Sequence, residues 1–194
     1  MKHIYTSVDI GTDTTKVVVT ELYKGKLNLL AASSIKSKGI KKGLITDVSE
    51  ASSSLSEALH EVEEMLGFKI KKILVNIPEF FSEFSKIQGE LKIDSEDMVI
   101  TGEHIKHVLQ NAINSTTFTK EIVSVIPIDF GIDEQDGIKD PKGLMGDVLR
   151  VRAVACLTPK KNVYSVVNSV DSLGLEVVDI SLNGIGDINA FRSK

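Results

Sequence analysis

The residues from Val8 to Val19 constrain the fold more than any other stretch, because two apolar runs flank a short polar turn. The valines and isoleucine on both sides favour strands, since β-branched side chains fit a pleated, buried surface. Gly11 has no Cβ, which suits a position where the backbone turns sharply or comes close to another group. The stretch therefore predicts a strand, a tight turn and a second strand.

The predicted turn also has the chemistry of an anion site. Threonine hydroxyls and an aspartate hold such a turn through local hydrogen bonds, and its backbone N–H groups point at an anion. Lys16 adds a charge that suits a phosphate oxygen, and Asp9, at the strand end, is placed to hold Mg²⁺ through water. We predict no catalytic residue. The predicted phosphate-binding residues are Asp9, Gly11, Thr12, Asp13, Thr14, Thr15 and Lys16.

A plain hairpin with a polar turn is the alternative interpretation. The stretch has neither the Walker pattern nor the Gly-x-Gly-x-x-Gly pattern of dinucleotide-binding folds. Its spacing, with Lys16 seven positions after Asp9, resembles the first phosphate loop of the actin, Hsp70 and sugar-kinase superfamily. That resemblance selects a superfamily and no single family.

Composition excludes several classes of protein. Of the 194 residues, 42% are hydrophobic and 26% charged, which fits one large or two small packed domains. A net charge of −4 gives no basic excess for nucleic-acid binding. The single cysteine, Cys156, has no partner for an internal disulfide, and no run approaches ~20 apolar residues. We therefore expect a cytoplasmic protein.

The first half of the chain alternates strands with a helix. Residues 27–32 predict a third strand, so that the chain begins with an antiparallel meander. Asp47 is a good N-cap, the apolar residues that follow have the helical period, and Gly67 suits the stop. Residues 71–78 then predict a buried strand that Pro78 ends. The Gly- and Lys-rich residues 37–47 are expected to form a solvated connection.

The same pattern returns near the other end of the chain. Thr158 is expected to be the N-cap of a helix, with Pro159 at its first position and Gly174 at its end. Residues 175–182 predict another buried strand. Helices that alternate with buried strands favour parallel pairing, so the two chain ends are predicted to share one sheet.

The middle of the chain predicts a separate small α+β unit. Strands are expected at 85–93, 121–130 and 148–157, with a helix that Thr101 caps and a loop over 133–146. His104 and His107 lie three residues apart on the polar side of this helix, and zinc would need further ligands. The acidic residues 94–97 lack the spacing of a Ca²⁺ loop and are expected to be solvated.

Together these motifs resemble the FtsA family of bacterial cell-division proteins, which are actin relatives. The resemblance covers almost the whole chain, including residues 9–16, the strand end after Ile73, and residues 174–180. Residues 39–45 and 137–141 are more telling than the phosphate turn. It implies an α/β fold: an actin-like, ribonuclease H-like mixed-sheet domain with an inserted α+β subdomain. Residues 1–82 and 157–194 would form subdomain 1A, and residues 83–156 subdomain 1C, also called SHS2.

The position of the insertion supports this resemblance. Actin, MreB, Hsp70 and many sugar kinases place their small subdomain between the third strand and the first helix. Here that segment, residues 33–46, is too short for a domain, and the extra unit follows Ile77 instead. FtsA and the type IV pilus protein PilM share this layout.

The resemblance implies a cytoskeletal adaptor that binds ATP with Mg²⁺ and polymerises. Such a protein anchors FtsZ filaments to the inner face of the cytoplasmic membrane at the division site, and its 1C subdomain recruits other division proteins. ATP would act as a structural ligand, with at most weak ATPase activity, so we expect no enzyme.

Several parts of an FtsA protein are expected beyond Lys194. They are the second phosphate loop, the lobe that contacts FtsZ and the membrane-targeting helix. The chain is therefore interpreted as a fragment that keeps one wall of an ATP site and binds ATP weakly or not at all. One phosphate loop supplies only part of the contacts, and association itself costs several kcal/mol.

Three alternatives stay open from the sequence. The first is a PilM-like pilus-assembly protein. The second is a fragment of a sugar-kinase-type phosphotransferase, which would need a carboxylate base and a second lobe. The third is an interaction domain whose nucleotide turn has lost its function.

Overall fold

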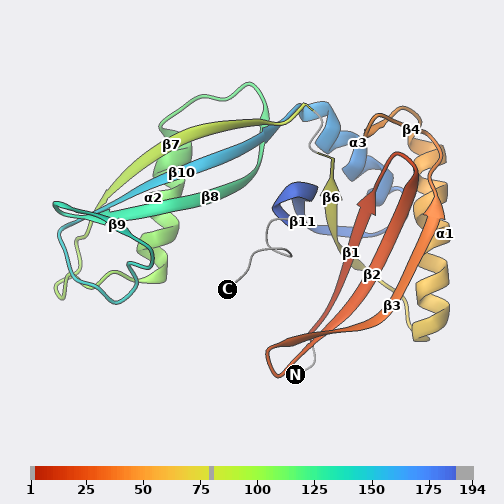
Figure 1. Ribbon diagram of the computed structural model, residues 1–194, viewed down its shortest axis with the longest axis horizontal. Coiled ribbons are helices and arrows are strands. Elements are labelled where there is room, and N and C mark those ends of the chain that lie inside the picture. The colour runs from red at the N-terminus through yellow and green to blue at the C-terminus, as the bar shows by residue number, and fades with distance from the viewer. Residues whose placement is uncertain (1–2, 79–80, 187–194) are drawn as a thin grey trace. The chain divides into compact units, whose positions relative to one another are not determined.

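The computed structural model describes residues 3–78 and 81–186 (Figure 1). The chain divides into two compact units: Met1–Phe81 together with Pro159–Lys194, and Ser82–Thr158. We call them unit 1 and unit 2. The boundaries expected from the sequence lie after residues 82 and 156. Among the described residues, no helix is both long and apolar enough to cross a lipid bilayer.

Unit 1 is built on a five-stranded mixed sheet with the order β11-β6-β1-β2-β3. The three N-terminal strands form the predicted antiparallel meander, while β6 runs parallel to β1 and β11 parallel to β6. The prediction that the two chain ends share one sheet is therefore confirmed. The strands are β1 (His3–Ile10), β2 (Thr14–Tyr23), β3 (Lys26–Lys36), β6 (Lys72–Ile77) and β11 (Glu176–Leu182).

Two helices, α1 (Val48–Leu66) and α3 (Lys160–Asp171), cover one face of this sheet. The two helices contact each other, since the Ser52 hydroxyl donates to the Ser169 carbonyl at 3.0 Å. Alternate strand residues such as Val8, Val17 and Val75 are buried beneath them. The strand residues between these, including Asp9 and Lys16, consequently face the opposite side.

Both ends of α1 lie where the sequence predicted them, whereas the start of α3 does not. Asp47 accepts a hydrogen bond from the Glu50 N–H at 3.0 Å, and Gly67 adopts the left-handed conformation at φ 74°. The predicted N-cap at Thr158 is wrong, because Thr158 is the last residue of β10 and pairs with Glu121. Pro159 takes the cap position without a side-chain hydrogen bond.

The connection over residues 37–47 is more ordered than expected. It contains a two-stranded ribbon, β4 (Ile40–Lys41) and β5 (Leu44–Ile45). The Gly39 carbonyl accepts hydrogen bonds from the backbone N–H groups of Thr46 and Asp47, at 2.7 and 3.0 Å. The ribbon is thereby attached to the start of α1.

Unit 2 is a four-stranded antiparallel sheet with the order β7-β10-β8-β9 and one helix packed on it (Figure 1). The core between them contains Ile87, Val108 and Val151, each at most 3% exposed. Gly89 on β7 allows the helix to approach closely, because a Cβ there would lie 2.5 Å from the Val108 carbonyl oxygen. The elements are β7 (Glu83–Lys92), α2 (Gly102–Asn114), β8 (Glu121–Ile132), β9 (Gln135–Ile138) and β10 (Val148–Thr158).

One sequence expectation changes in unit 2, and His104 gains a role that the sequence did not indicate. Residues 133–146 were expected to form a loop, but Gln135–Ile138 form the edge strand β9. His104 has a structural role: Thr101 and His104 form a capping box, in which the Thr101 N–H donates to His104 Nδ1 at 3.2 Å. Among the described residues, no group of three or more His, Cys, Asp or Glu side chains is arranged to hold a metal.

The face of the unit 2 sheet away from α2 carries a charged cleft of about 430 Å³. Arg152 donates two hydrogen bonds to Asp129, one of them from Nε at 2.7 Å. Arg150 Nη2 lies 3.1 Å from an Asp136 carboxylate oxygen. The Arg152–Asp129 pair joins the neighbouring strands β10 and β8, and the Arg150–Asp136 pair reaches from β10 across β8 to β9.

The Arg152–Asp129 pair predicts a dependence of stability on acid pH. The hydrogen bond from Arg152 holds the pKa of Asp129 below its ordinary value of 3.8, against the opposing effect of burial. Because the folded pKa is the lower one, this stabilisation is complete above about pH 4 and is lost as pH falls through the folded pKa. We expect Asp129→Asn to reduce the acid sensitivity of unit 2 in denaturant unfolding measured at pH 6 and pH 3. Asp136→Asn, with a side chain 75% exposed, is the control and should retain that sensitivity.

Candidate functional site

Asp9 and Lys16 lie directly opposite each other on β1 and β2, next to the predicted phosphate turn. Lys16 Nζ is 3.3 Å from Asp9 Oδ2, and the two side chains are 52% and 25% exposed. Both side chains project from the sheet face opposite the helices. The structure therefore brings together the two charged residues of the predicted phosphate and metal site, and leaves the lysine accessible.

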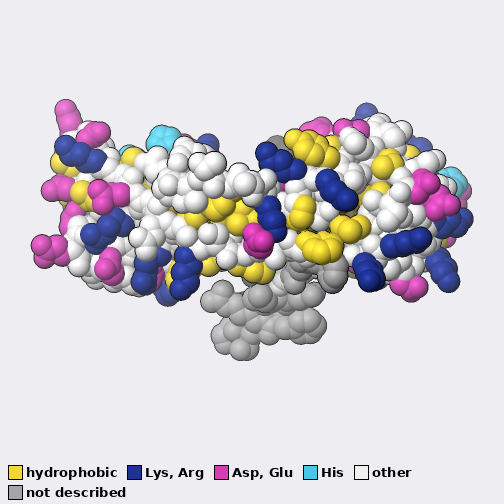
Figure 2. All heavy atoms as spheres, turned by 90° about the horizontal axis from the view of Figure 1, so that it is seen from above, with side chains coloured by type: hydrophobic (Ala, Val, Ile, Leu, Met, Phe, Trp, Pro, Cys, Tyr) yellow, Lys and Arg dark blue, Asp and Glu magenta, His cyan; other side chains and the backbone are white. Residues whose placement is uncertain are grey.

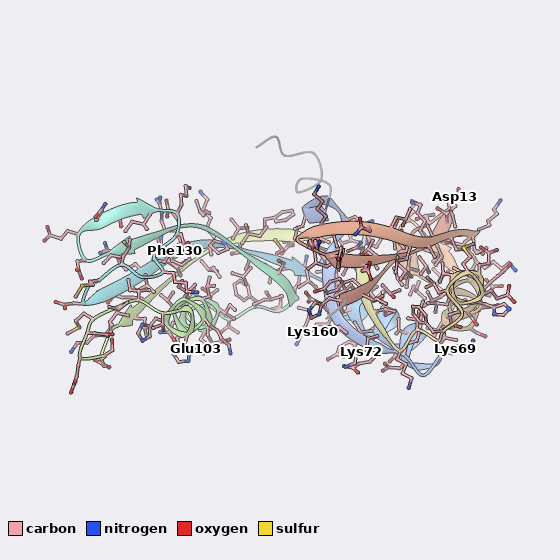
Figure 3. All side chains as sticks on the ribbon, turned by 90° about the horizontal axis from the view of Figure 1, so that it is seen from below. Asp13, Lys69, Lys72, Glu103, Phe130 and Lys160 are labelled. Atoms are coloured by element: carbon pink, nitrogen blue, oxygen red, sulfur yellow. The ribbon has the colours of Figure 1, made fainter. Side chains whose placement is uncertain are left out.

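Gly11 is required by a close approach within the turn. A Cβ at this position would lie 2.8 Å from the Thr14 carbonyl oxygen. The Gly11 N–H already donates to that same oxygen at 3.1 Å. The glycine thus closes the turn, while Asp13 at its tip is exposed (Figure 3).

Thr15 lies on the other face from Lys16. It is fully buried, and its hydroxyl lies 2.8 Å from the Ser37 hydroxyl in a hydrogen bond. Ser37 also donates its backbone N–H to the Asp13 carbonyl at 2.8 Å. The Thr15 side chain therefore holds the turn to the end of β3 and faces away from the side where Asp9 and Lys16 project.

Thr12 connects the turn to the β4–β5 ribbon. Its hydroxyl oxygen accepts a hydrogen bond from the Gly43 N–H at 2.7 Å. The ribbon turn has left-handed backbone at Lys42 (φ 50°) and Gly43 (φ 73°), and both Lys41 and Lys42 are exposed. The structure consequently places a lysine-rich turn in direct contact with the candidate phosphate turn, although these lysines were expected only to be solvated.

Two asparagines belong to this site and were missed in the sequence analysis. Asn183 Nδ2 donates to Asp9 Oδ1 at 3.1 Å, so the Asp9 carboxylate is held by Lys16 on one oxygen and by Asn183 on the other. The Asn183 amide oxygen is buried and accepts no hydrogen bond within the described part of the chain. Asn76 pairs in register with Asp9, and its Nδ2 lies 3.5 Å from the Ser7 hydroxyl. Asn76 could have been identified from the sequence, because it is a polar residue within the otherwise apolar strand 73–77.

This set of groups fits a phosphate with a hydrated divalent cation. Lys16 supplies a positive charge, Thr12 a hydroxyl, and Asp9 a carboxylate that can accept hydrogen bonds from metal-bound water. A phosphate at Lys16 would compete with Asp9 for the ammonium group, 3.3 Å away. The Lys16 ammonium nevertheless has three N–H donors, so the residues present fit a phosphate beside the existing contact with Asp9.

Comparisons with known proteins agree with this architecture. Residues 82–156 match the family model described as the SHS2 domain inserted in FtsA. The cell division protein FtsA of Streptococcus pneumoniae is 30% identical over 187 residues, which are 96% of this chain and 41% of that protein. FtsA of Bacillus subtilis is 32% identical over 192 residues, 98% of this chain and 44% of that protein. This chain is a relative of FtsA.

The chain spans about two fifths of the length of the curated FtsA relatives that it matches. Among solved structures, a PilM–PilN type IV pilus biogenesis complex is similar, with a TM-score of 0.57 and 14% identity over 95% of this chain and 49% of that chain. This likeness shows the fold alone. The expected fold class is confirmed: an actin-like mixed-sheet α/β domain with an inserted SHS2 domain.

Proposed function

We propose that this chain is the phosphate-binding part of an FtsA-type cell-division adaptor that binds ATP with Mg²⁺. The observation that carries the proposal is the Asp9–Lys16 pair beside a closed Gly11 turn, in a chain that matches FtsA proteins over nearly its whole length. Lys16 binds a β- or γ-phosphate oxygen, and Asp9 orients the water molecules of the magnesium ion. Gly11, Thr12, Asp13, Thr14 and Thr15 form the turn around the phosphates.

In this proposal ATP is a conformational ligand and the protein is no fast ATPase. A ligand shifts a conformational equilibrium only through its different affinity for the two states. The Thr12 turn is a suitable contact, because the Thr12 hydroxyl oxygen now accepts the Gly43 N–H and a phosphate oxygen would compete with it for that donor. Nucleotide binding would thereby be coupled to the ribbon that precedes α1.

The wider cellular role follows from the FtsA relatives and is equally a proposal. The protein would self-associate into filaments, anchor FtsZ filaments at the inner face of the cytoplasmic membrane, and recruit other division proteins through the SHS2 domain. The contacts with FtsZ and with the membrane would use parts of an FtsA protein that this chain does not match.

A chimera tests this function. Residues 1–194 would replace the matching segment of B. subtilis FtsA, in versions with Lys16→Ala and, as a control, Lys26→Ala. Lys26 is an exposed lysine at the start of β3, away from the turn. Loss of a charge-assisted hydrogen bond worth about 1.5–3 kcal/mol should weaken Mg-ATP binding roughly ten- to hundredfold for Lys16→Ala alone. Calorimetry measures this change, and cell length measures division.

The outcomes separate the competing functions. Unchanged ATP affinity and unchanged filament formation in Lys16→Ala would refute the phosphate role of the turn and favour an interaction domain. A chimera that binds ATP but does not support septation would favour the PilM-like alternative, which rests on the structural likeness. For the chain alone, submicromolar ATP binding would contradict the view that it supplies one wall of the site.

A further inference from the structure

The antiparallel strands β1, β2 and β3 extend beyond the parallel part of the unit 1 sheet. Pairing between β1 and β6 begins at Ser7, whereas β1 pairs with β2 from His3 onward. We call the extending part the arm, and it comprises residues 3–6, 19–23 and 26–31. The arm ends at the β2–β3 turn, at the lower edge of unit 1 in Figure 1. Tyr23 is about 23 Å along β2 from Lys16, so the arm and the phosphate turn lie at opposite ends of the same strands.

Large apolar side chains are exposed on the arm, in contrast to the other half of the same strands. Nearer the phosphate turn, Val8 and Val17 are fully buried. On the arm, Leu27 and Leu29 are each 67% exposed and Tyr23 is 50% exposed. The exposed apolar residues of the arm are Ile4, Tyr5, Tyr23, Leu27, Leu29 and Leu30. The described part of the chain leaves this apolar surface in contact with solvent.

The apolar side chains occupy both faces of the arm. Leu27 pairs in register with Leu22, an even number of positions after Lys16 on β2, so it projects from the same face as Lys16. Leu29 is two positions further along β3 and shares this face. Tyr23 follows Leu22 directly on β2 and consequently projects from the other face. A protein docked on one face of the sheet would cover only one of these two groups.

The tip of the arm is basic as well as apolar. Residues 22–27 contain two lysines and no acidic residue. Lys24 Nζ lies 5.3 Å from the centre of the Tyr23 ring, in a cation–π contact, and Lys26 pairs in register with Tyr23. On the face of unit 1 in the right half of Figure 2, by contrast, acidic side chains lie among the lysines. The charge of the tip is therefore complementary to an anionic surface.

A second copy of this chain is a poor occupant of the arm. β3 is an edge strand of the sheet, where strands of two molecules can pair. Because β3 begins at Lys26 and ends at Lys36, full antiparallel pairing would place Lys26 of each copy opposite Lys36 of the other. Like charges directly opposite each other destabilise such a pair.

We propose that the arm is a membrane contact, whose tip inserts into the headgroup region of an anionic lipid bilayer. Burial of apolar surface is non-directional, and a bilayer surrounds an inserted hairpin, so it receives apolar side chains from both faces. Tyrosine rings and lysine stems prefer this interface, where the ammonium groups reach anionic headgroups. The contact goes beyond the proposed function, which assigns the membrane to parts of an FtsA protein that this chain does not match.

Sedimentation with lipid vesicles tests the proposal on the 194-residue chain. We expect binding to vesicles that contain phosphatidylglycerol, weaker as salt rises, and much less binding to pure phosphatidylcholine. Leu27→Ser combined with Leu29→Ser should weaken binding at least about tenfold, because two large apolar side chains are lost from the interface. Met145→Ser is the matched control and should leave binding unchanged, since its side chain in unit 2 is 66% exposed, close to the 67% of Leu27.

The lysines of the tip have a separate test. Lys24→Gln combined with Lys26→Gln should weaken binding to the anionic vesicles roughly tenfold and reduce its salt dependence, since each lysine adds to the attraction. Lys160→Gln combined with Lys161→Gln, at exposed positions on α3, is the control and should change neither. Lys26→Ala alone should leave ATP binding unchanged, because the arm lies at the other end of the strands from the phosphate turn.

A tryptophan reporter locates the contact. The chain contains no tryptophan, so Leu27→Trp introduces a single one at the tip. Its emission should shift to shorter wavelength with anionic vesicles, because indole rings settle at the membrane interface. Tyr164→Trp is the control and should show no shift, since Tyr164 lies on α3 and its side chain is 60% exposed.

Several results would overturn the proposal. They are no vesicle binding by the intact chain, an equal loss of binding in Met145→Ser, or an emission shift from Tyr164→Trp and none from Leu27→Trp. In the B. subtilis FtsA chimera without vesicles, protection of Tyr23 and Leu27 from hydroxyl-radical footprinting would also overturn it, by making another part of the longer protein the occupant. These results leave the ATP role of Lys16 untouched, so the two proposals fail separately. Circular dichroism checks that each variant is folded, which the exposure of the substituted side chains leads us to expect.

Discussion

Replacing Gly89 by alanine is expected to unfold unit 2 or to leave it only marginally stable. The new Cβ would lie 2.5 Å from both the Ala112 nitrogen and the Val108 carbonyl oxygen, which are backbone atoms of α2. Neither atom can move without displacing the helix from its sheet. Overpacking of a well-packed core typically costs about 1–3 kcal/mol, and this rigid backbone contact should cost about 3 kcal/mol or more. Urea unfolding followed by circular dichroism measures the loss.

Gly102→Ala is the control for this substitution within the same unit. Gly102 is the first residue of α2, and nothing lies within 4 Å of a Cβ placed there. Alanine should be neutral or slightly stabilising at this position, because it loses less conformational freedom in a helix than glycine. Equal destabilisation by the two substitutions would show that α2 does not contact β7 as closely as described.

Gly39→Ala is expected to have the second large effect, on unit 1. Gly39 has φ 68°, and a Cβ there would lie 2.4 Å from the Asp47 carbonyl oxygen and 2.8 Å from Glu50 Cβ. The left-handed backbone alone costs a residue with a Cβ roughly 1–2 kcal/mol, and the contact with the start of α1 should bring the total to about 3 kcal/mol. Denaturant unfolding monitored by a probe in unit 1 provides the measurement.

Gly25→Ala separates these two contributions. Gly25 has a similar backbone, with φ 74°, but nothing lies within 4 Å of its Cβ position. Only the cost of the left-handed conformation should remain, about 1 kcal/mol. If Gly39→Ala were no more harmful than Gly25→Ala, the contact between residue 39 and the start of α1 would be absent. In that case Gly39 would not hold the β4–β5 ribbon to the start of α1, beside the Gly11 turn.

Sequence periodicity predicted most of the fold because its elements are long and strongly patterned. The apolar stripe of α1 between Asp47 and Gly67 is an example, since both helix signals and the period agree. The alternation of helices with buried strands likewise predicted parallel pairing within one sheet, which the structure shows for β11 and β6. Each of these features is encoded by neighbours in sequence.

The missed features depend on contacts that are distant in sequence. The strand β9 has the polar sequence Gln-Asp-Gly-Ile, and it pairs with β8 at the edge of an existing sheet. Thr158 has a side chain that suits an N-cap, but it belongs to β10, where it pairs with Glu121. At the candidate site, Asp9 and Lys16 could be predicted because both belong to one hairpin. The contact of Asn183 with Asp9 spans 174 positions and has no local signature.

The discontinuous sheet of unit 1 has a consequence for the order of folding. Lys72 and Glu176 are bonded across β6 and β11 although 104 positions separate them, so this pairing closes a very long loop. Unit 2 reduces that entropic cost once it has formed, because Glu83 and Leu157 are cross-strand neighbours and hold the two crossing points of the chain together. During synthesis on the ribosome, the inserted domain can therefore fold first. It then limits how far β11, the last strand of the surrounding domain, can separate from its partner β6.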